Sequence, residues 1–284
     1  MWVPFLIMLR EGVEAALVVG IIAGYLNRTS RSHWLSAVWV GVLLAAALSL
    51  FVGAGLQWIG AEFPQRQQEL FEAVVGLFAV GILTYMVFWM RRMARSVKQE
   101  LHASLEAALA HGTRSQAYAL IAMVFLAVAR EGLETVFFLL AVFQQSRDPA
   151  APLGALLGLA AAVAIGWGLY RGSLRINLGR FFRFTSLFLL IVAAGILANA
   201  VQALHEAGVW NHLQGVVFDL GTRLPTDSAL GSLLAGFFGY QEAPTVSTLG
   251  TYLVYLAICL TLFFRLPAQL ASRRRTAPVS ETTE

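Results

Sequence analysis

Apolar residues in this chain gather in seven long runs separated by short polar segments. The runs cover about residues 3 to 25, 35 to 60, 69 to 90, 117 to 143, 152 to 171, 184 to 205 and 248 to 265. A helix needs roughly 20 apolar residues to cross the hydrocarbon core of a bilayer, whereas strands of a β-barrel would alternate over about 10 residues. The pattern predicts an all-α polytopic membrane protein with seven transmembrane helices.

The composition agrees with this prediction. Hydrophobic residues make up 58% and charged residues 13% of the 284 residues, whereas soluble domains carry about 25% charged residues. The N-terminus has no basic segment and no small-residue cleavage site, so we expect the first run to remain in the mature protein. Cys259 is the single cysteine and falls inside the last run. It can form no intrachain disulfide, and we expect it in the core.

Basic residues are concentrated on alternate connections. The connections after the first, third and fifth runs and the C-terminal segment carry Arg28, Arg31, Arg91, Arg92, Arg95, Lys98, Arg114, Arg171, Arg175, Arg180, Arg183, Arg265, Arg273, Arg274 and Arg275. The opposite connections carry Arg66, Arg147 and Arg223. The positive-inside rule then predicts an outer N-terminus and a cytoplasmic C-terminus. The formal charge of +4 therefore reflects topology, and no nucleic-acid partner is implied.

Two charged strings recur in the chain. "REGVEAALVV" at 10–19 returns as "REGLETVFFL" at 130–139, and "AVGIL" at 79–83 is echoed by "AAGIL" at 193–197. This repetition predicts two copies of a three-helix unit, and because three is odd, the copies have opposite orientations in the membrane. Inverted repeats of this kind place the substrate site near the bilayer midplane in many transporters. The predicted single permease domain, 1–265, comprises repeat one (about 1–91), repeat two (about 117–205), an outer loop (206–247) and a seventh helix (248–265).

Three further segments lie outside the predicted spans. Residues 95 to 110 repeat an apolar side chain every fourth residue, which is typical of a helix lying on the cytoplasmic membrane surface. An ordinary connecting helix remains an alternative. The apolar stretch 229–238 is too short to span, so we expect it to fold back on the bundle. We expect residues 266–284 to form a disordered cytoplasmic tail.

Six charged residues lie at mid-membrane depth within the apolar runs, three in each string. Helical spacing puts Glu11 and Glu14 on one face with Arg10 one turn from Glu14, and the second string repeats this with Arg130, Glu131 and Glu134. Burial of a charge at the bilayer centre costs at least about 2.5 kcal/mol, so such residues usually face the bundle interior and are functional. The four carboxylates are predicted to converge between the repeats.

A cage of carboxylate oxygens suits a hard cation. Gly12, Ala16, Gly20 and Gly24 form a small-residue stripe on the first run, which predicts close approach of a neighbouring helix. Internal Arg–Glu salt bridges that merely hold the bundle together are the structural alternative.

Acidic residues also gather near the predicted outer surface, where they would raise the local cation concentration. The candidate entrance residues are Glu62, Glu69, Glu72, His205, Glu206 and His212. Ordinary solvated or interfacial roles are the alternative for each of them, and a histidine at this position is more often a hydrogen-bonding residue than a metal ligand.

With these motifs in place, the chain resembles the oxidase-dependent iron transporter family, which includes the fungal high-affinity iron permeases. The resemblance rests on both REGxE strings and on "PFLIMLREG", "AEFPQ", "MVFWMRR", "VAREGLE", "HEAGVWNH" and "FGYQEAP", which are closest to the bacterial ferrous iron permeases of the family. These six ordered matches are spread over nearly the whole chain.

The resemblance implies an iron uptake permease of the bacterial cytoplasmic (inner) membrane, with no permanently bound cofactor and with iron as the transported substrate. It implies that both REGxE strings, residues 10–14 and 130–134, are required for transport. It also implies partners: a multicopper ferroxidase in fungi, and a periplasmic cupredoxin-like protein and a haem peroxidase in bacteria.

Other functions remain open at this point. A transporter of manganese or another divalent ion fits the same carboxylates, and either Fe2+ or Fe3+ fits an all-oxygen site. A metal-dependent intramembrane hydrolase would use the carboxylates and His205 to activate water, but the chain offers no obvious nucleophile. A structural membrane scaffold would tolerate changes such as Glu11→Gln.

Overall fold

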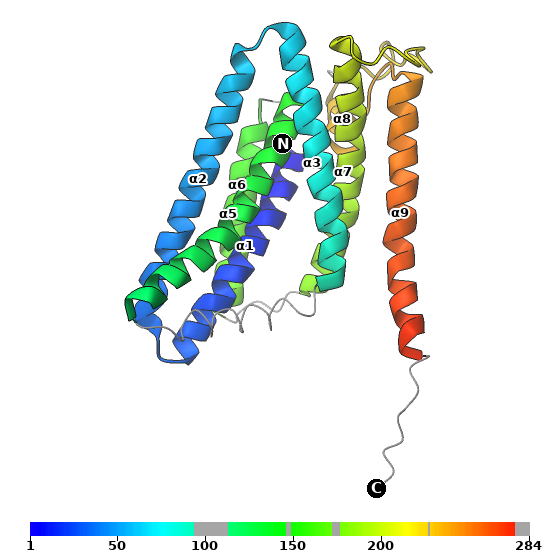
Figure 1. Ribbon diagram of the computed structural model, residues 1–284. Coiled ribbons are helices and arrows are strands. Elements are labelled where there is room, and N and C mark those ends of the chain that lie inside the picture. The colour runs from blue at the N-terminus through cyan, green and yellow to red at the C-terminus, as the bar shows by residue number, and fades with distance from the viewer. Residues whose placement is uncertain (94–112, 146–148, 172–176, 227, 276–284) are drawn as a thin grey trace.

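The chain folds into long helices, as the computed structural model in Figure 1 shows for residues 1–93, 113–145, 149–171, 177–226 and 228–275. The helices are α1 (Trp2–Arg28), α2 (Leu35–Glu62), α3 (Gln65–Met93), α5 (Thr113–Gln145), α6 (Ala151–Tyr170), α7 (Leu178–Glu206), α8 (Ala229–Phe238) and α9 (Val246–Arg275), with a 3-10 turn η1 at Ser32–Trp34. The described residues contain no β-strand beyond one isolated bridge between Val216 and Thr245. The prediction of an all-α fold is confirmed.

Five of these helices, α2, α3, α6, α7 and α9, are long and apolar enough to cross a membrane. The other two long helices, α1 and α5, carry the REGxE strings, and each string places three charged residues among the apolar ones. Large apolar side chains on the outside of the bundle are exposed, such as Leu50 and Phe51 on α2. Exposed apolar surface of this kind is stable next to lipid and not next to water. The chain is therefore a multi-pass membrane protein, while the count of seven spans stays a prediction.

The main helix pairs join the part of the chain before residue 94 to the part after residue 112. α1 packs along α6, whereas α5 packs along α2, and α3 packs along α7. α1 and α5 also contact each other in the middle of the bundle, and α9 lies against α7 at one edge (Figure 1). A core of buried side chains from α1, α3, α5 and α7 joins the halves, including Ile7, Leu83, Phe138 and Leu189. Each of the two REGxE helices, α1 and α5, thus packs on the second helix of the other predicted repeat, α6 or α2.

The glycine of each REGxE string allows this close packing. A Cβ atom on Gly12 would lie 2.6 Å from the Cβ of Ala162 on α6, and one on Gly132 would collide with the Ser49 side chain on α2. Small residues let helix backbones approach closely in a membrane. Within the predicted stripe on α1, Gly20 and Gly24 have no atom within 4 Å of an added Cβ. The stripe prediction is therefore correct for Gly12 and for Ala16, whose Cβ would lie 2.5 Å from a Cβ added to Gly166 of α6, and wrong for Gly20 and Gly24.

The loop before α9 folds back on the bundle through α8, which packs against α7 and α1. Its C-cap Gly239 has a φ of 64°, and a Cβ on Gly195 of α7 would lie 2.7 Å from the Cα of Gly239. This contact requires two glycines, because one backbone must adopt the left-handed conformation while the other offers no side chain.

Two predictions concern segments outside the helix bundle, the surface helix and the C-terminal tail. Residues 95–110, the predicted surface helix, lie outside the described residues. α9 continues to Arg275, so the predicted start of the tail at residue 266 is wrong. The residues after Arg265 have high helix propensity apart from Pro267, which explains the longer helix. Cys259 is buried, as expected.

Candidate metal site between the two REGxE strings

The first string begins with two fully buried charged residues. The side chains of Arg10 and Glu11 are 0% and 1% exposed. Nη1 of Arg10 donates to Oε1 of Glu11 at 2.6 Å, and Nη2 lies 2.9 Å from Oε1 of Glu14. A buried arginine is stable only when acidic groups compensate for its lost hydration. The helical spacing of the string supplies both acidic groups from the same helix.

The second string brings a third carboxylate to the same place. One carboxylate oxygen from each of Glu11, Glu14 and Glu131 lies within 4.8 Å of the other two. Glu134 is not part of this group. Instead, Oε1 of Glu134 accepts a hydrogen bond of 3.0 Å from Nε of Arg130. The predicted convergence of the two strings is therefore observed for three carboxylates, with the fourth beside them.

Each of the four glutamates keeps one buried oxygen that accepts no hydrogen bond from the described residues: Oε2 of Glu11, Oε1 of Glu14, Oε2 of Glu131 and Oε2 of Glu134. The Glu14 oxygen is at ion-pair distance from Arg10, but its geometry does not meet that of a hydrogen bond. Buried polar atoms are usually paired. The buried oxygens of Glu11, Glu131 and Glu134 thus have neither a hydrogen bond nor an ion pair among the described residues, and carboxylate oxygens are the ligands that a hard cation prefers.

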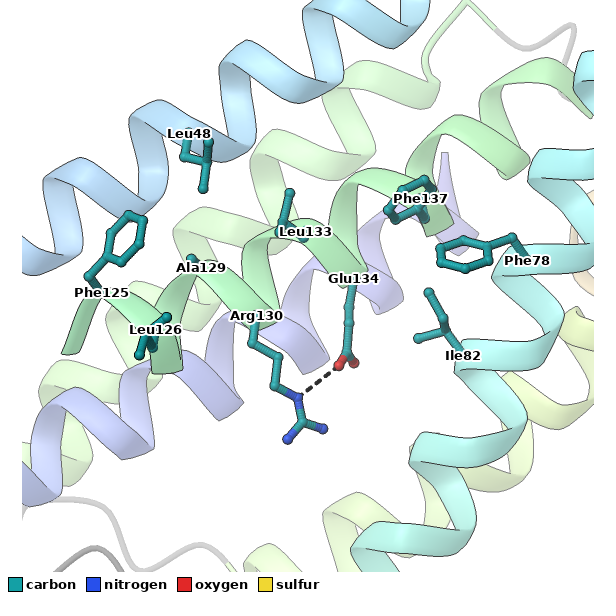
Figure 2. A pocket seen from close by; sticks show the side chains of 10 residues that line it. All are labelled: Leu48, Phe78, Ile82, Phe125, Leu126, Ala129, Arg130, Leu133, Glu134 and Phe137. Carbon is teal, nitrogen blue, oxygen red and sulfur yellow. Dashed lines mark hydrogen bonds and ion pairs between the residues drawn. The ribbon is translucent and has the colours of Figure 1, made fainter. Parts of the chain in front are cut away.

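The two arginines differ in their surroundings. Arg130 is 42% exposed, whereas Arg10 is fully buried. Arg130 and Glu134 point from α5 into a groove of about 440 Å³, whose walls come from α2, α3 and α5 and include Leu48, Phe78 and Phe125 (Figure 2). A charged pair within the apolar part of a bundle usually faces water or other protein groups. The groove is thus a candidate route between the carboxylates and the outside of the bundle.

Three residues near the site carry no role in the sequence interpretation. Nη1 of Arg10 lies 3.4 Å from the sulfur of Met86, and Nη2 lies 3.1 Å from the sulfur of Met90. The guanidinium carbon of Arg130 lies 4.6 Å from the ring centre of Trp89. All three residues belong to the string "MVFWMRR". Their spacing of three and four residues on one helix face is the feature that would have grouped them.

The candidate entrance residues form only one carboxylate contact among the described residues. The carboxyl group of Glu69 on α3 lies at hydrogen-bond distance from that of Glu206 at the end of α7. Glu72 and Glu206 are each bonded to a glutamine on their own helix. Glu62 is exposed at the end of α2. Part of the predicted acidic entrance is therefore brought together, at the ends of two packed helices.

The two histidines of "HEAGVWNH" contact different residues. Nε2 of His205 is 3.1 Å from Oγ of Ser247, at the start of α9. His212 is exposed and packs edge to face on Trp210. Neither histidine lies in the group of potential ligands that the described residues form. Hydrogen bonding and aromatic packing, the ordinary roles of these residues, account for their positions.

The comparison of the chain with known families agrees with this chemistry. The model of the iron permease FTR1 family matches residues 1–277. The chain is a member of this family. The family resemblance inferred from the motifs is thereby confirmed, and the chain is a membrane permease for iron and not an enzyme.

Curated relatives match over almost their full length. The chain is 56% identical over 271 residues to "Ferrous iron permease EfeU" of Yersinia pestis, which covers 95% of this chain and 96% of the relative. It is 54% identical over 277 residues to the protein of the same name from Escherichia coli O157:H7, covering 98% of this chain and all of the relative. No solved structure matches the chain.

Proposed function

We propose that this chain imports iron across a bacterial cytoplasmic membrane and that Glu11, Glu14, Glu131 and Glu134 bind the ion in transit. The observation that carries the proposal is that each of these four glutamates has a buried oxygen that accepts no hydrogen bond from the described residues, and that only the Glu14 oxygen has an ion pair instead. A bundle stabilised only by Arg–Glu salt bridges would have little reason to leave these oxygens unpaired, because each costs about 1 to 3 kcal/mol. A bound cation compensates for all four.

The formal charge of the site favours a divalent ion. Four carboxylates and the two guanidinium groups of Arg10 and Arg130 leave a formal charge of −2. Fe2+ neutralises this charge, which agrees with the name of the relatives as ferrous iron permeases. Mn2+ has the same charge and similar ligand preferences. Competition between the two ions in reconstituted vesicles distinguishes a ferrous permease from a general divalent transporter.

The exchange of helix partners supports an inverted repeat. α1 on α6 and α5 on α2 are equivalent pairs under a two-fold axis in the membrane plane, and α3 on α7 is the pair that the axis maps onto itself. Such an axis places the two strings at similar depth on opposite sides of one site. In this arrangement the N-terminus is outside, the C-terminus is cytoplasmic, and the ion moves inward from the acidic ends of α3 and α7.

The outer end is also the side from which partners would deliver iron. We propose that Glu69, Glu72 and Glu206 receive the ion there, because facing carboxylates attract a cation before it enters the bundle. The family resemblance suggests a periplasmic cupredoxin-like protein and a haem peroxidase as the proteins that act on this side.

The function is tested by uptake of radioactive iron in bacterial cells that lack other iron importers. Glu14→Gln and Glu134→Gln are each expected to abolish uptake, because each removes a charge and an anionic ligand while keeping the shape of the side chain. Asp219→Asn is the matched control, since Asp219 is exposed and hydrogen-bonds to the backbone of Gly221 outside the helices. Normal uptake by both glutamine variants would contradict the proposed site.

A further inference from the structure

One face of α3 contacts the arginines of both strings. Met86, Trp89 and Met90 are spaced three and four residues apart, so they lie on the same side of the helix. The sulfur atoms of Met86 and Met90 lie 3.4 Å and 3.1 Å from the guanidinium nitrogens of Arg10. Trp89 stacks against Arg130. α3 thus contacts both positive charges of the site while supplying none of its carboxylates.

The guanidinium of Arg10 has more donors than the carboxylates satisfy. Its Nε atom has no hydrogen-bond partner among the described residues, and the group is fully buried. An arginine has five N–H donors, and a thioether sulfur is a weak acceptor. Unpaired donors in a buried site are costly. The two sulfur atoms therefore accept hydrogen bonds from the two terminal nitrogens of this guanidinium.

We propose that Met86 and Met90 are positioning residues that hold the Arg10 guanidinium against Glu11 and Glu14. Each terminal nitrogen of Arg10 contacts one carboxylate and one thioether, Nη1 with Glu11 and Met86 and Nη2 with Glu14 and Met90. The guanidinium held in this way occupies one oxygen of Glu11 and leaves the other for the ion. Sulfur suits this role because it accepts weakly: a carboxylate in its place would draw the arginine away from the site. This inference rests on the proposed function of the carboxylates.

The second repeat lacks the equivalent acceptors. Aligning "AVGIL" with "AAGIL" puts Ala200 and Leu204 of α7 at the positions of Met86 and Met90. Neither side chain can accept a hydrogen bond. Correspondingly, Arg130 is 42% exposed and packs on an aromatic ring. The two arginines are therefore not equivalent: Arg10 is fully buried between acceptors from α1 and α3, whereas Arg130 is partly exposed.

The experiment compares leucine with glutamine at each methionine. Met→Leu keeps the apolar volume and removes the acceptor, whereas Met→Gln keeps the chain length and supplies an amide oxygen. Met123 is the control, because it packs against the apolar cluster of α1, α2 and α5. Packing alone ranks leucine above glutamine at every position. If residues 86 and 90 must accept a hydrogen bond from Arg10, the glutamine variants transport better than the leucine variants at these two positions only.

Initial rates of iron uptake are normalised to the amount of each variant in the membrane. The double variant Met86→Leu/Met90→Leu is expected to lower the maximal rate about tenfold, and each single leucine variant about threefold. The corresponding glutamine variants are expected to transport better than the leucine variants, while Met123→Leu transports better than Met123→Gln.

Leucine variants that transport as well as or better than glutamine variants at residues 86 and 90 would overturn this inference. Glu14→Gln, measured beside them, separates it from the proposed function. Lost uptake in Glu14→Gln together with normal uptake in the leucine variants contradicts the methionine role alone. Normal uptake in Glu14→Gln contradicts the carboxylate site itself.

Discussion

The glycine of the first REGxE string offers a quantitative test of how the site is built. A Cβ on Gly12 would lie 2.6 Å from the Cβ of Ala162, which is itself fully buried on α6. Ordinary contact between such carbons needs about 3.5 to 4 Å. Gly12→Ala therefore requires the backbones of α1 and α6 to separate by about 1 Å. Because Glu11 adjoins Gly12, this separation displaces a carboxylate of the site.

The expected magnitude combines two opposing effects. Overpacking costs about 1 to 3 kcal/mol, and replacing glycine by alanine within a helix gains up to about 1 kcal/mol. Gly12→Ala is therefore expected to destabilise the protein by about 0 to 3 kcal/mol. The effect on transport is expected to be larger, since a misplacement of about 1 Å can cost about 100-fold in a site that depends on geometry.

Iron uptake and thermal unfolding of the purified protein measure these two effects. Gly20→Ala is the control, because it makes the same change on the same helix with no atom within 4 Å. The exchange variant Gly12→Ala/Ala162→Gly moves the methyl group to the opposite helix and is expected to recover uptake. Equal uptake by Gly12→Ala and Gly20→Ala, or a failure of the exchange variant to recover, would refute the reasoning.

Two further predictions concern the outer loop. Gly195→Ala is expected to destabilise the protein by about 1 to 3 kcal/mol, because its Cβ would meet the backbone of Gly239. Thermal unfolding measures this loss of stability. Gly250→Ala is the control and should leave the stability unchanged, since its Cβ would meet no atom within 4 Å. Glu242→Leu is expected to cost about 1.5 to 3 kcal/mol, since Oε2 of Glu242 accepts hydrogen bonds from the backbone and hydroxyl of Thr226. The KM for iron should not change in Glu242→Leu, and a large rise in KM at normal stability would instead make Glu242 an ion ligand.

Local sequence patterns are sufficient to predict the helices and the location of the charged strings. Apolar runs of membrane length and the i, i+3 spacing of Glu11 and Glu14 depend only on nearby residues. The end of α9 is less well predicted, because Pro267 and the polar residues from Ser272 onward interrupt the apolar run while most residues of 266–275 have high helix propensity. Hydropathy alone marks the end of an apolar run and not the end of a helix.

Contacts between distant segments are a different matter. The hydrogen bonds from Arg10 to Met86 and Met90 join residues 76 and 80 positions apart. Methionine on an apolar helix is ordinary in sequence, so nothing in its neighbourhood marks these two as partners of a buried arginine. The same holds for Gly12 and Gly132, whose string identifies them as part of a motif but does not indicate which helix they contact.

By itself, the sequence determines that this protein is helical, resides in a membrane, repeats one charged string and belongs among iron permeases. Only the tertiary structure decides that α1 packs on α6 and α5 on α2. It also decides that Glu11, Glu14 and Glu131 meet while Glu134 lies beside them. Finally, it decides that Arg10 is buried while Arg130 is partly exposed. The physical reason is that helix formation and membrane burial are set by each segment's own composition. The pairing of helices and the environment of each charge depend on side-chain shapes from segments far apart in the chain.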